Sequence, residues 1–154
     1  MALIFRRMKE EDLDKVYELE VLSFTDPWLR EFFEMGLHYD AFIALSDEEL
    51  AGYICTMQVL DECTITNICV KQELRRHGIA RYLMDNTIQT MDERGVRYYY
   101  LEVRISNRAA VNLYNHLGFR QVGLRKEYYH NPVEDAMVMA MERNNGIERQ
   151  DERL

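Results

Sequence analysis

The apolar positions near the start of the chain follow first a strand-like and then a helical period. Residues 3–7 form a short run that predicts a strand, and residues 11–23 place apolar side chains at roughly helical spacing. Asp26 followed by Pro27 is typical of an N-cap and a first helical residue. We therefore expect a strand, a helix and a second, shorter helix that ends near Gly36.

The next part of the chain is rich in β-branched, aromatic and other apolar side chains. Residues 41–45 and 50–60 form two such runs, and the polar residues 46–49 between them are typical of a turn. Residues 64–70 form a third run of the same kind. The pattern predicts a hairpin that is continued by a third strand.

The clearest helical pattern covers residues 79–94. Its apolar positions recur at helical spacing, and its charged residues fall on other faces, which is typical of an amphipathic helix. Gly95 follows directly and is expected to end the helix in the left-handed conformation. The expected core-facing positions are Ile79, Leu83, Met84, Thr87, Ile88 and Met91.

A strand and a further helix are predicted after this amphipathic helix. Residues 96–103 have the composition of a strand, and Ser106 or Asn107 can cap the helix that follows. Gly118 is expected to end that helix. Its apolar positions are Val111, Tyr114 and Leu117.

The last predicted elements are two strands, residues 119–124 and 136–141, joined by a loop that holds Tyr128 and Tyr129. The resulting order, β-α-α-β-β-β-α-β-α-β-β in one domain, predicts the α+β class, with helices covering a mixed, mostly antiparallel sheet. We place the domain at residues 1–142. The charged residues 143–154 are expected to form a flexible tail.

Composition limits the classes of function. A length of 154 residues with 47% hydrophobic content fits one domain with a single core. A formal charge of −8 disfavours direct binding of nucleic acid, because that affinity comes largely from Lys and Arg. No apolar run reaches 18 residues and no signal peptide is evident, so we expect a cytoplasmic protein that does not enter a membrane.

The metal-ligating residue types do not cluster in the sequence. Cys55, Cys63 and Cys69 lie in apolar runs without C-x-x-C spacing, so we interpret them as reduced thiols of the core. The histidines lack the spacing of a ligand set, and no metal site is expected. They are His38, His77, His116 and His130.

The strongest motif is Arg75-x-x-Gly78-x-Ala80, which lies between a predicted strand and the amphipathic helix. A glycine turn before a helix presents unpaired backbone N–H groups and the positive end of the helix dipole to an anion. Arg76 and Arg81 add positive charge to this otherwise acidic chain. The motif favours a pyrophosphate site. A helix start with a solvated basic cluster remains the alternative.

This motif resembles the acyl-CoA loop R/Q-x-x-G-x-G/A of the GNAT acetyltransferases, with alanine at the last position. Further motifs occur in the order of that family, and the resemblance spans about residues 3–142. They are Leu101-Glu102-Val103-Arg104-Ile105-Ser106-Asn107, Ala110-Val111-Asn112-Leu113-Tyr114 and Leu117-Gly118-Phe119. Neither the P-loop nor the Rossmann glycine pattern is present.

Within the family the chain is most similar to N-terminal protein acetyltransferases of the RimI and Ard1 types. The resemblance implies the GNAT fold, in which a splayed pair of central strands admits acetyl-CoA from one face and a peptide N-terminus from the other. Backbone groups of a strand would bind the pantetheine arm, and the loop would bind the pyrophosphate. The residues implied for acetyl-CoA are Ile68, Cys69, Val70, Arg75, Arg76, His77, Gly78, Ile79, Ala80, Arg81 and Asn107.

The resemblance also implies two catalytic residues. Glu102 would accept the proton of the amine, directly or through a water molecule, and Tyr114 would protonate the leaving thiolate. Without the resemblance, Glu102 could equally be a salt-bridged surface residue, and Tyr114 could be a packing residue of its helix. Asn107 could contact the cofactor and also cap its helix, since the two roles are compatible.

The substrate-side residues implied by the resemblance are Phe24, Pro27 and Trp28 in one loop and Tyr128 and Tyr129 in another. The expected substrate is a protein or peptide N-terminus, such as the N-terminal alanine of a ribosomal protein. The sequence does not decide whether an auxiliary subunit is needed. A lysine or small-amine acetyltransferase and a noncatalytic CoA-binding module are the alternatives.

Overall fold

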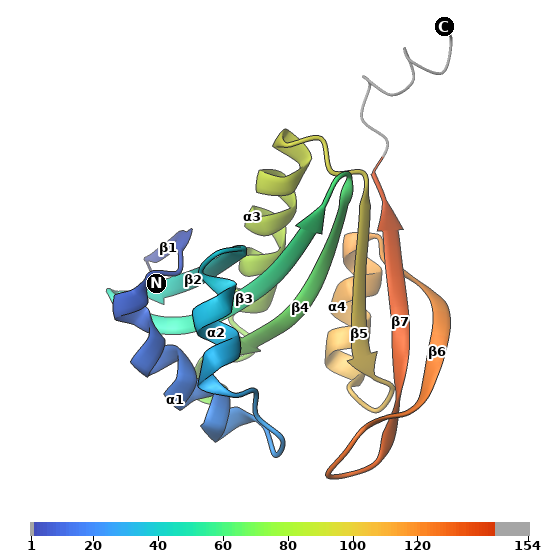
Figure 1. Ribbon diagram of the computed structural model, residues 1–154, viewed down its shortest axis with the longest axis horizontal. Helices are drawn as coiled ribbons and strands as arrows, with labels where there is room; N and C mark the ends of the chain where they lie inside the picture. The colour runs from blue at the N-terminus through green and yellow to red at the C-terminus, as the bar shows by residue number, and fades with distance from the viewer. Residues whose placement is uncertain (1, 144–154) are drawn as a thin grey trace, which may run out of the picture.

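The computed structural model describes residues 2–143, and these residues form the eleven helices and strands in the expected order, with two added 3₁₀ turns. Figure 1 shows their arrangement. The strands are β1 (Leu3–Arg7), β2 (Asp40–Ser46), β3 (Glu49–Val59), β4 (Glu62–Val70), β5 (Tyr98–Arg104), β6 (Arg120–Tyr129) and β7 (Glu134–Glu142). The helices are η1 (Glu10–Asp12), α1 (Leu13–Ser23), α2 (Arg30–Gly36), η2 (Gln72–Leu74), α3 (Ile79–Glu93) and α4 (Arg108–Leu117).

The seven strands form one sheet in the order β1-β2-β3-β4-β5-β7-β6. All neighbours pair in antiparallel fashion except β4 and β5, which are parallel. The α+β class and the mixed, mostly antiparallel sheet predicted from the sequence are therefore confirmed. The parallel pair joins an N-terminal half of the sheet to a C-terminal half.

The parallel pair is short, and the two strands then separate. Their ladder runs from Glu62 paired with Tyr98 to Ile65 paired with Leu101, and both strands continue beyond that point. Thr66, the next residue of β4, has no partner in the register with β3, so it forms a β-bulge that bends the strand. The sheet opens where the bulge begins, as the two diverging strands in Figure 1 show.

The helices cover both faces of the sheet. A cluster that includes Val16 of α1 and Phe33 of α2 packs on one face. A second cluster, which includes the inner face of α3 and Tyr114 of α4, packs on the other. The buried residues of α3 are the six predicted from its pattern: Ile79, Leu83, Met84, Thr87, Ile88 and Met91. Burying the apolar side chains of the two clusters stabilises both layers.

Two local predictions are wrong. Asp26 and Pro27 do not begin a helix, since α2 starts at Arg30 with Leu29 at its N-cap. The segment before α2 is held as a loop instead, because the Trp28 N–H donates a hydrogen bond to a side chain of α1. Strand β6 also extends further than expected, so Tyr128 and Tyr129 lie at its end and not in the loop that follows.

Arg143, which the sequence analysis placed in the tail, is bonded to the folded part of the chain. Its backbone N–H donates to the Arg97 carbonyl at 2.7 Å, and its guanidinium pairs with Asp92 at 2.9 Å. The rest of the predicted tail, residues 144–154, lies outside the described residues. No described helix is long and apolar enough to cross a membrane.

Candidate active site

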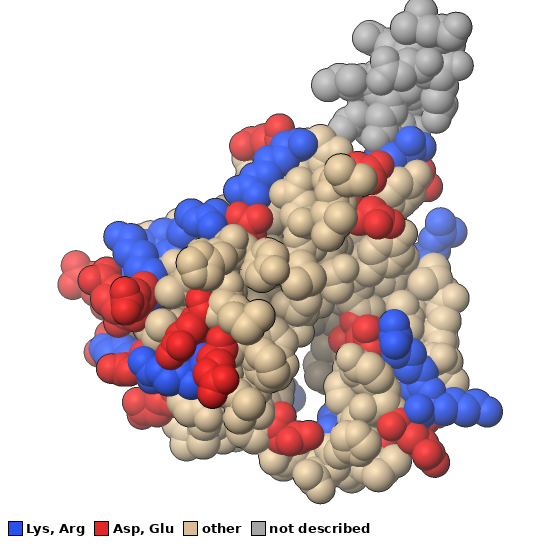
Figure 2. Space-filling model, viewed as in Figure 1, with Lys and Arg blue, Asp and Glu red and all other residues tan. Residues whose placement is uncertain are grey.

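A cleft of about 800 Å³ occupies the opening between β4 and β5. Figure 2 shows a hollow between the two halves of the molecule. The cleft is lined by both strands, by the loop between α1 and α2, by α4 and by the β6–β7 hairpin. The structure thus brings together eight of the predicted site residues: Phe24, Trp28, Ile68, Glu102, Asn107, Tyr114, Tyr128 and Tyr129.

Glu102 enters the cleft from β5. Tyr99, Leu101 and Val103 on the same strand pack toward α3 and α4, so the alternation of a strand turns Glu102 to the opposite face. Its Oε2 atom is buried without a hydrogen-bond partner, although the Arg125 Nε atom lies 3.4 Å away. A buried carboxylate oxygen without a partner is costly, and an amine bound in the cleft could satisfy it.

Tyr114 enters the cleft from the other face, on α4. Asn107 caps this helix, because its Oδ1 accepts a hydrogen bond from the Ala110 N–H at 3.3 Å. The Tyr114 ring packs edge-on against Phe119 at 6.0 Å. Burial raises the pKa of Tyr114 to about 12, and the charge of Tyr129 raises it too. The hydroxyl therefore holds its proton at neutral pH and can act as an acid.

Tyr128 and Tyr129 form the wall of the cleft nearest to Glu102. Their rings meet edge-to-face at 5.1 Å. Burial and the charge of Glu102 raise the pKa of Tyr128, and the same two causes raise the pKa of Tyr129 to about 12. Both hydroxyls remain protonated at neutral pH and can donate hydrogen bonds.

The β6–β7 hairpin that carries these tyrosines is fastened to β5. Arg104 donates to the carbonyl oxygens of His130 and Pro132 at 3.1 and 3.0 Å, and its guanidinium stacks over the Tyr129 ring at 4.4 Å. Glu134 pairs with Arg104 at 3.2 Å. Hydrogen bonds from Ser106 are the largest cause that lowers the pKa of Glu134, followed by those from Arg104. These contacts fix the position of the wall.

The predicted pyrophosphate loop lies at the N-terminus of α3. Gly78 has a φ of +78° and forms the N-cap, and no side chain caps the helix there. A Cβ atom built on Gly78 meets nothing within 4 Å, so the space in front of the first turn is open. An uncapped helix start beside Arg76 and Arg81 fits the pyrophosphate of a CoA.

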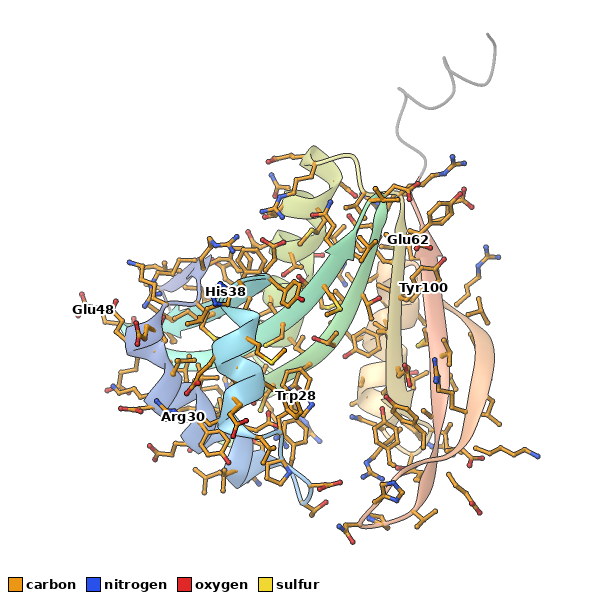
Figure 3. All side chains as sticks on the ribbon, viewed as in Figure 1. Trp28, Arg30, His38, Glu48, Glu62 and Tyr100 are labelled. Atoms are coloured by element: carbon orange, nitrogen blue, oxygen red, sulfur yellow. The ribbon has the colours of Figure 1, made fainter. Side chains whose placement is uncertain are left out.

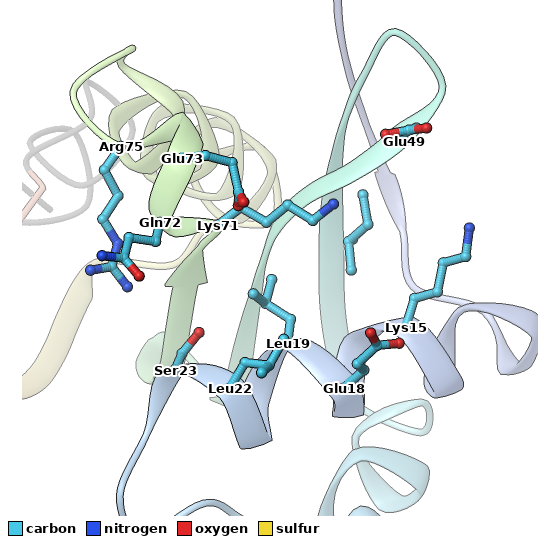
Figure 4. Close-up of a pocket in the computed structure, with 11 residues that line it drawn as sticks. Lys15, Glu18, Leu19, Leu22, Ser23, Glu49, Lys71, Gln72, Glu73 and Arg75 are labelled. Carbon is cyan, nitrogen blue, oxygen red and sulfur yellow. The ribbon is translucent and has the colours of Figure 1, made fainter.

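The remaining predicted residues lie outside the main cleft. Pro27 is half-buried beside Trp28, and Cys69 and Val70 are buried at the end of β4. Arg75 donates to the Val70 carbonyl and lines a second cavity of about 620 Å³. Figure 4 shows this cavity, where Lys71, Glu73 and Arg75 face the helix α1. Arg76, His77 and Arg81 are exposed around Gly78.

The cysteines and histidines add no second centre to the part of the chain that the structure describes. Cys55, Cys63 and Cys69 are buried and are not joined by disulfides. Burial raises the pKa of the Cys55 and Cys63 thiols to about 12. Within residues 2–143 no group of three His, Cys, Asp or Glu side chains could hold a metal ion.

Sequence reasoning missed Glu20, whose buried side chain lines the cleft from α1. It also missed Asn67 on the separated part of β4 and Arg125 beside Glu102. One signal was available for Glu20: it lies four residues after Val16, at a core-facing position of an amphipathic helix. A carboxylate at such a position needs hydrogen-bond donors from elsewhere in the fold.

Comparison with known proteins identifies the family of the chain. The model of the Acetyltransferase (GNAT) family matches residues 13–119. A relative from Bacillus subtilis (strain 168), with the provisional name [ribosomal protein bS18]-alanine N-acetyltransferase, is 39% identical over 140 residues, 87% of this chain and 91% of that protein. The [ribosomal protein bS18]-alanine N-acetyltransferase of Escherichia coli (strain K12) is 36% identical over 138 residues, 87% and 93% of the two chains.

A solved structure agrees with the sequence relatives. The crystal structure of the ribosomal-protein-S18-alanine N-acetyltransferase from Escherichia coli superposes with a TM-score of 0.87 at 32% identity, and the match covers 94% of this chain and 97% of that one. The family match covers the cleft residues Glu102 and Tyr114 as well as the loop around Gly78. This chain therefore belongs to the GNAT family and is an N-acetyltransferase whose acetyl donor is acetyl-CoA.

Proposed function

We propose that this enzyme acetylates the α-amino group of protein N-termini and that its substrate is the N-terminal alanine of ribosomal protein bS18. The names of the relatives that match most of the chain support this substrate. The observation that carries the proposal is the position of Glu102 in the cleft, where its buried Oε2 forms an ion pair with Arg125 at 3.4 Å but accepts no hydrogen bond. Such a substrate places the enzyme in the cytoplasm.

The acetyl donor and the amine that accepts the acetyl group would bind on opposite faces of the sheet. Ile68, Cys69 and Val70 on β4 would bind the pantetheine arm through backbone groups that β5 no longer pairs, and Asn107 would contact the same arm. The first turn of α3 and the basic residues from Arg75 to Arg81 would hold the pyrophosphate. When it is bound, acetyl-CoA supplies an acetyl group that is activated as a thioester.

Glu102 and Tyr114 would move the protons of the reaction. Glu102 takes a proton from the amine as it attacks, directly or through water, and Tyr114 gives a proton to the departing thiolate. An α-amino group has a reference pKa of about 7.7–8.0, against about 10.4 for lysine. An N-terminus is therefore much easier to deprotonate at neutral pH, and a carboxylate suffices as the base.

Substrate recognition would fall to the α1–α2 loop and to the end of β6, which flank the cleft. Phe24, Pro27 and Trp28 lie on the side of α1, and Tyr128 and Tyr129 lie on the side of β6. Figure 3 shows Trp28 beside the lower end of β4, at the edge of the opening. Hydroxyl groups that bond the substrate backbone would set the distance between the first α-carbon and the thioester, and would exclude the longer lysine side chain.

A matched pair of peptides tests the proposal. One peptide carries a free N-terminal alanine and an internal lysine, and the other is identical except for a blocked N-terminus. We expect rapid acetylation of the first and slow acetylation of the second, with mass spectrometry placing the acetyl group on the α-amine. Acetylation of lysine next to an untouched N-terminus would favour a lysine acetyltransferase and reject the proposal.

Specificity for the first residue needs a separate comparison. Peptides with the bS18 sequence and Ala, Ser, Thr or Met in the first position should be used at equal concentration with saturating acetyl-CoA. The proposal predicts the largest kcat/KM for alanine. Equal values for all four peptides would contradict a dedicated bS18 enzyme and favour a broad N-terminal acetyltransferase.

A further inference from the structure

Glu20 is a buried carboxylate at the wall of the cleft. It lies on α1 with 2% of its surface exposed, and no step of the proposed reaction uses it. An isolated carboxylate at such a place would be strongly destabilising. Its burial is possible because donors from other parts of the fold converge on it.

Three hydrogen-bond donors reach Glu20 from three different segments. Its Oε1 accepts from the Tyr53 hydroxyl of β3 at 2.5 Å and from the Asn67 side-chain amide of β4 at 2.8 Å. Its Oε2 accepts from the Trp28 backbone N–H at 2.9 Å. Burial and the nearby charges raise the pKa of Tyr53, so this hydroxyl stays a donor. Glu20 thus ties α1 to the sheet and to the loop before α2.

The residue holds this loop at both ends. The backbone carbonyl of Glu20 accepts from the Phe24 N–H at 3.1 Å, at the point where α1 ends. Its side chain accepts from Trp28, at the other end of the same loop. The Trp28 ring then packs against Phe33 at 5.3 Å. Phe24 and Trp28 both line the cleft, so Glu20 fixes part of the wall that a substrate would meet.

Glu20 and Glu102 differ in their hydrogen bonds. Both oxygens of Glu20 accept hydrogen bonds from the protein, whereas Oε2 of Glu102 accepts none and forms an ion pair with Arg125 at 3.4 Å. A base needs a lone pair that can face the amine, and of these two carboxylates Glu102 is the one with a buried oxygen that accepts no hydrogen bond. The arrangement suits Glu20 to hold other groups in place and not to accept the proton.

We infer that Glu20 is a positioning residue for the peptide substrate: through the Trp28 backbone and the Asn67 side chain it holds the α1–α2 loop in the shape that receives the first residues of the peptide. The inference rests on the proposed function, because it concerns the peptide. A wall that is ordered before binding avoids an ordering cost when the substrate arrives. Asn67 precedes the segment of β4 proposed for the pantetheine arm, but the proposed pyrophosphate site at the α3 N-terminus lies outside this wall, so acetyl-CoA binding should change much less than peptide binding.

The variant Glu20→Gln tests the inference. A glutamine keeps the size of the side chain but offers one acceptor oxygen, and its NH₂ group cannot accept from Trp28 or Asn67. We expect the KM of the bS18 peptide to rise roughly tenfold or more, while the KM of acetyl-CoA stays within about twofold. Trp28 is the single tryptophan of the chain, so fluorescence reports on this loop, and acrylamide should quench it more in the variant.

Asp12→Asn is the matched control. Asp12 precedes α1, and its carboxylate also accepts three hydrogen bonds, two from Arg6 and one from the Lys9 N–H. It does not line the cleft. This variant should lower the melting temperature but leave the peptide KM and the Trp28 quenching unchanged. An unchanged peptide KM in Glu20→Gln, or an equal rise for peptide and acetyl-CoA, would overturn the inference.

If Glu20→Gln does not fold, amide hydrogen exchange of the unaltered protein tests the inference. The Trp28 amide should then exchange as slowly as amides of β3 in the free enzyme, since Glu20 holds it before any peptide binds. Exchange at the rate of an exposed amide would overturn the inference. Failure of the proposed function would give a different result: the unaltered enzyme itself would prefer the peptide with the blocked N-terminus.

Discussion

The hydroxyl of Thr25 donates a hydrogen bond to the backbone carbonyl oxygen of Asn131 at 2.5 Å. Thr25 lies in the loop between α1 and α2, and Asn131 lies in the turn between β6 and β7. The two loops that flank the cleft therefore touch across its opening, although 106 residues separate them in sequence. The contact joins the N-terminal and C-terminal halves of the molecule at the end opposite to the short parallel ladder.

Thr25→Val should weaken the use of the peptide. Valine keeps the shape of threonine but cannot donate, so the two loops lose their link and must be ordered by the substrate. We expect the peptide KM to rise roughly two- to tenfold, the range of a single neutral hydrogen bond, with the acetyl-CoA KM unchanged. Thr90→Val removes a similar hydrogen bond on α3 and serves as the control. An unchanged peptide KM would show that the link has no role in binding, and a lower one would show that the link hinders it.

Gly78→Val should weaken the binding of acetyl-CoA. Gly78 has a left-handed φ of +78° at the N-cap of α3, which a β-branched residue cannot adopt without strain. Relaxation of the loop would move the first N–H groups of the helix away from the pyrophosphate and raise the acetyl-CoA KM roughly tenfold.

Gly95→Val is the control for this variant. Gly95 lies just beyond the other end of α3, has a φ of +85° and also has open space around a built Cβ. Both variants should lose similar stability in thermal unfolding. If Gly95→Val raised the acetyl-CoA KM as much as Gly78→Val does, the assignment of the pyrophosphate to the α3 N-terminus would be wrong.

Glu102→Gln should lower kcat while acetyl-CoA binding is retained. Removal of a general base typically costs roughly 10² to 10⁴ in rate. A higher pH should restore part of the activity, because more of the substrate amine is then neutral. The comparison is Glu62→Gln at the closed end of the β4–β5 ladder, where Figure 3 shows Glu62 near Tyr100. Full activity of Glu102→Gln at neutral pH would assign the base role elsewhere.

Tyr114→Phe should also lower turnover, by roughly 10²-fold, without a large change in the acetyl-CoA Kd. Phenylalanine keeps the packing against Phe119, and the loss is confined to a hydroxyl whose pKa of about 12 leaves it protonated at neutral pH. Single-turnover measurements separate this chemical step from binding. Tyr17→Phe on α1 is a control outside the cleft. A normal single-turnover rate would reduce Tyr114 to a packing residue.

The free energy of unfolding should fall as the pH rises above 9. Burial raises the pKa of Cys55 and Cys63 from 9.0 to about 12. In the unfolded chain these thiols ionise near pH 9, whereas in the folded protein they stay protonated up to about pH 12. Their contribution to the free energy of unfolding is therefore complete below pH 9 and is lost between pH 9 and 12. Each thiol should lower stability by up to about 1.4 kcal/mol per pH unit. Urea unfolding between pH 8 and 10, under reducing conditions, measures the slope.

Cys63→Ala provides the check on this assignment. The variant should be less stable at pH 8, because a buried side chain is shortened, but its slope between pH 9 and 10 should be smaller by the share of one thiol. An identical slope would mean that other groups, such as the buried tyrosines, cause the alkaline loss of stability.

Much of the secondary structure followed from local pattern. The six core-facing residues of α3 were predicted from spacing alone, because a helix period repeats within a few residues. Gly95 and Gly118 were expected to end helices, and both have positive φ angles just after the last helical residues. Asp26 and Pro27 misled the same reasoning, because a hydrogen bond from Trp28 to the buried side chain of Glu20 overrode the local preference for a helix start.

The candidate site depended more on residues that are far apart in sequence. Glu102 and Tyr114 were named through the motifs that carry the family resemblance, and the structure brings them to one cleft. The position of Arg125 beside Glu102 was not foreseen. Arg125 on β6 reaches Glu102 on β5 diagonally across β7, and the order of these strands is set by the whole sheet. Tyr128 and Tyr129 were placed in a loop because the end of an edge strand has little hydrophobic signal.

The sequence by itself determined the order of the elements, the apolar faces that must be buried, the glycine turns and the acidic surface, because each depends on neighbours within a few residues. The tertiary structure alone decided where the sheet opens, which carboxylate has a buried oxygen that accepts no hydrogen bond and which carboxylate is held by donors. Those features depend on the bulge at Thr66, on the end of the ladder at Ile65 and Leu101, and on contacts between distant segments. Burial and hydrogen bonding distinguish Glu20 from Glu102, a difference that their residue type does not reveal.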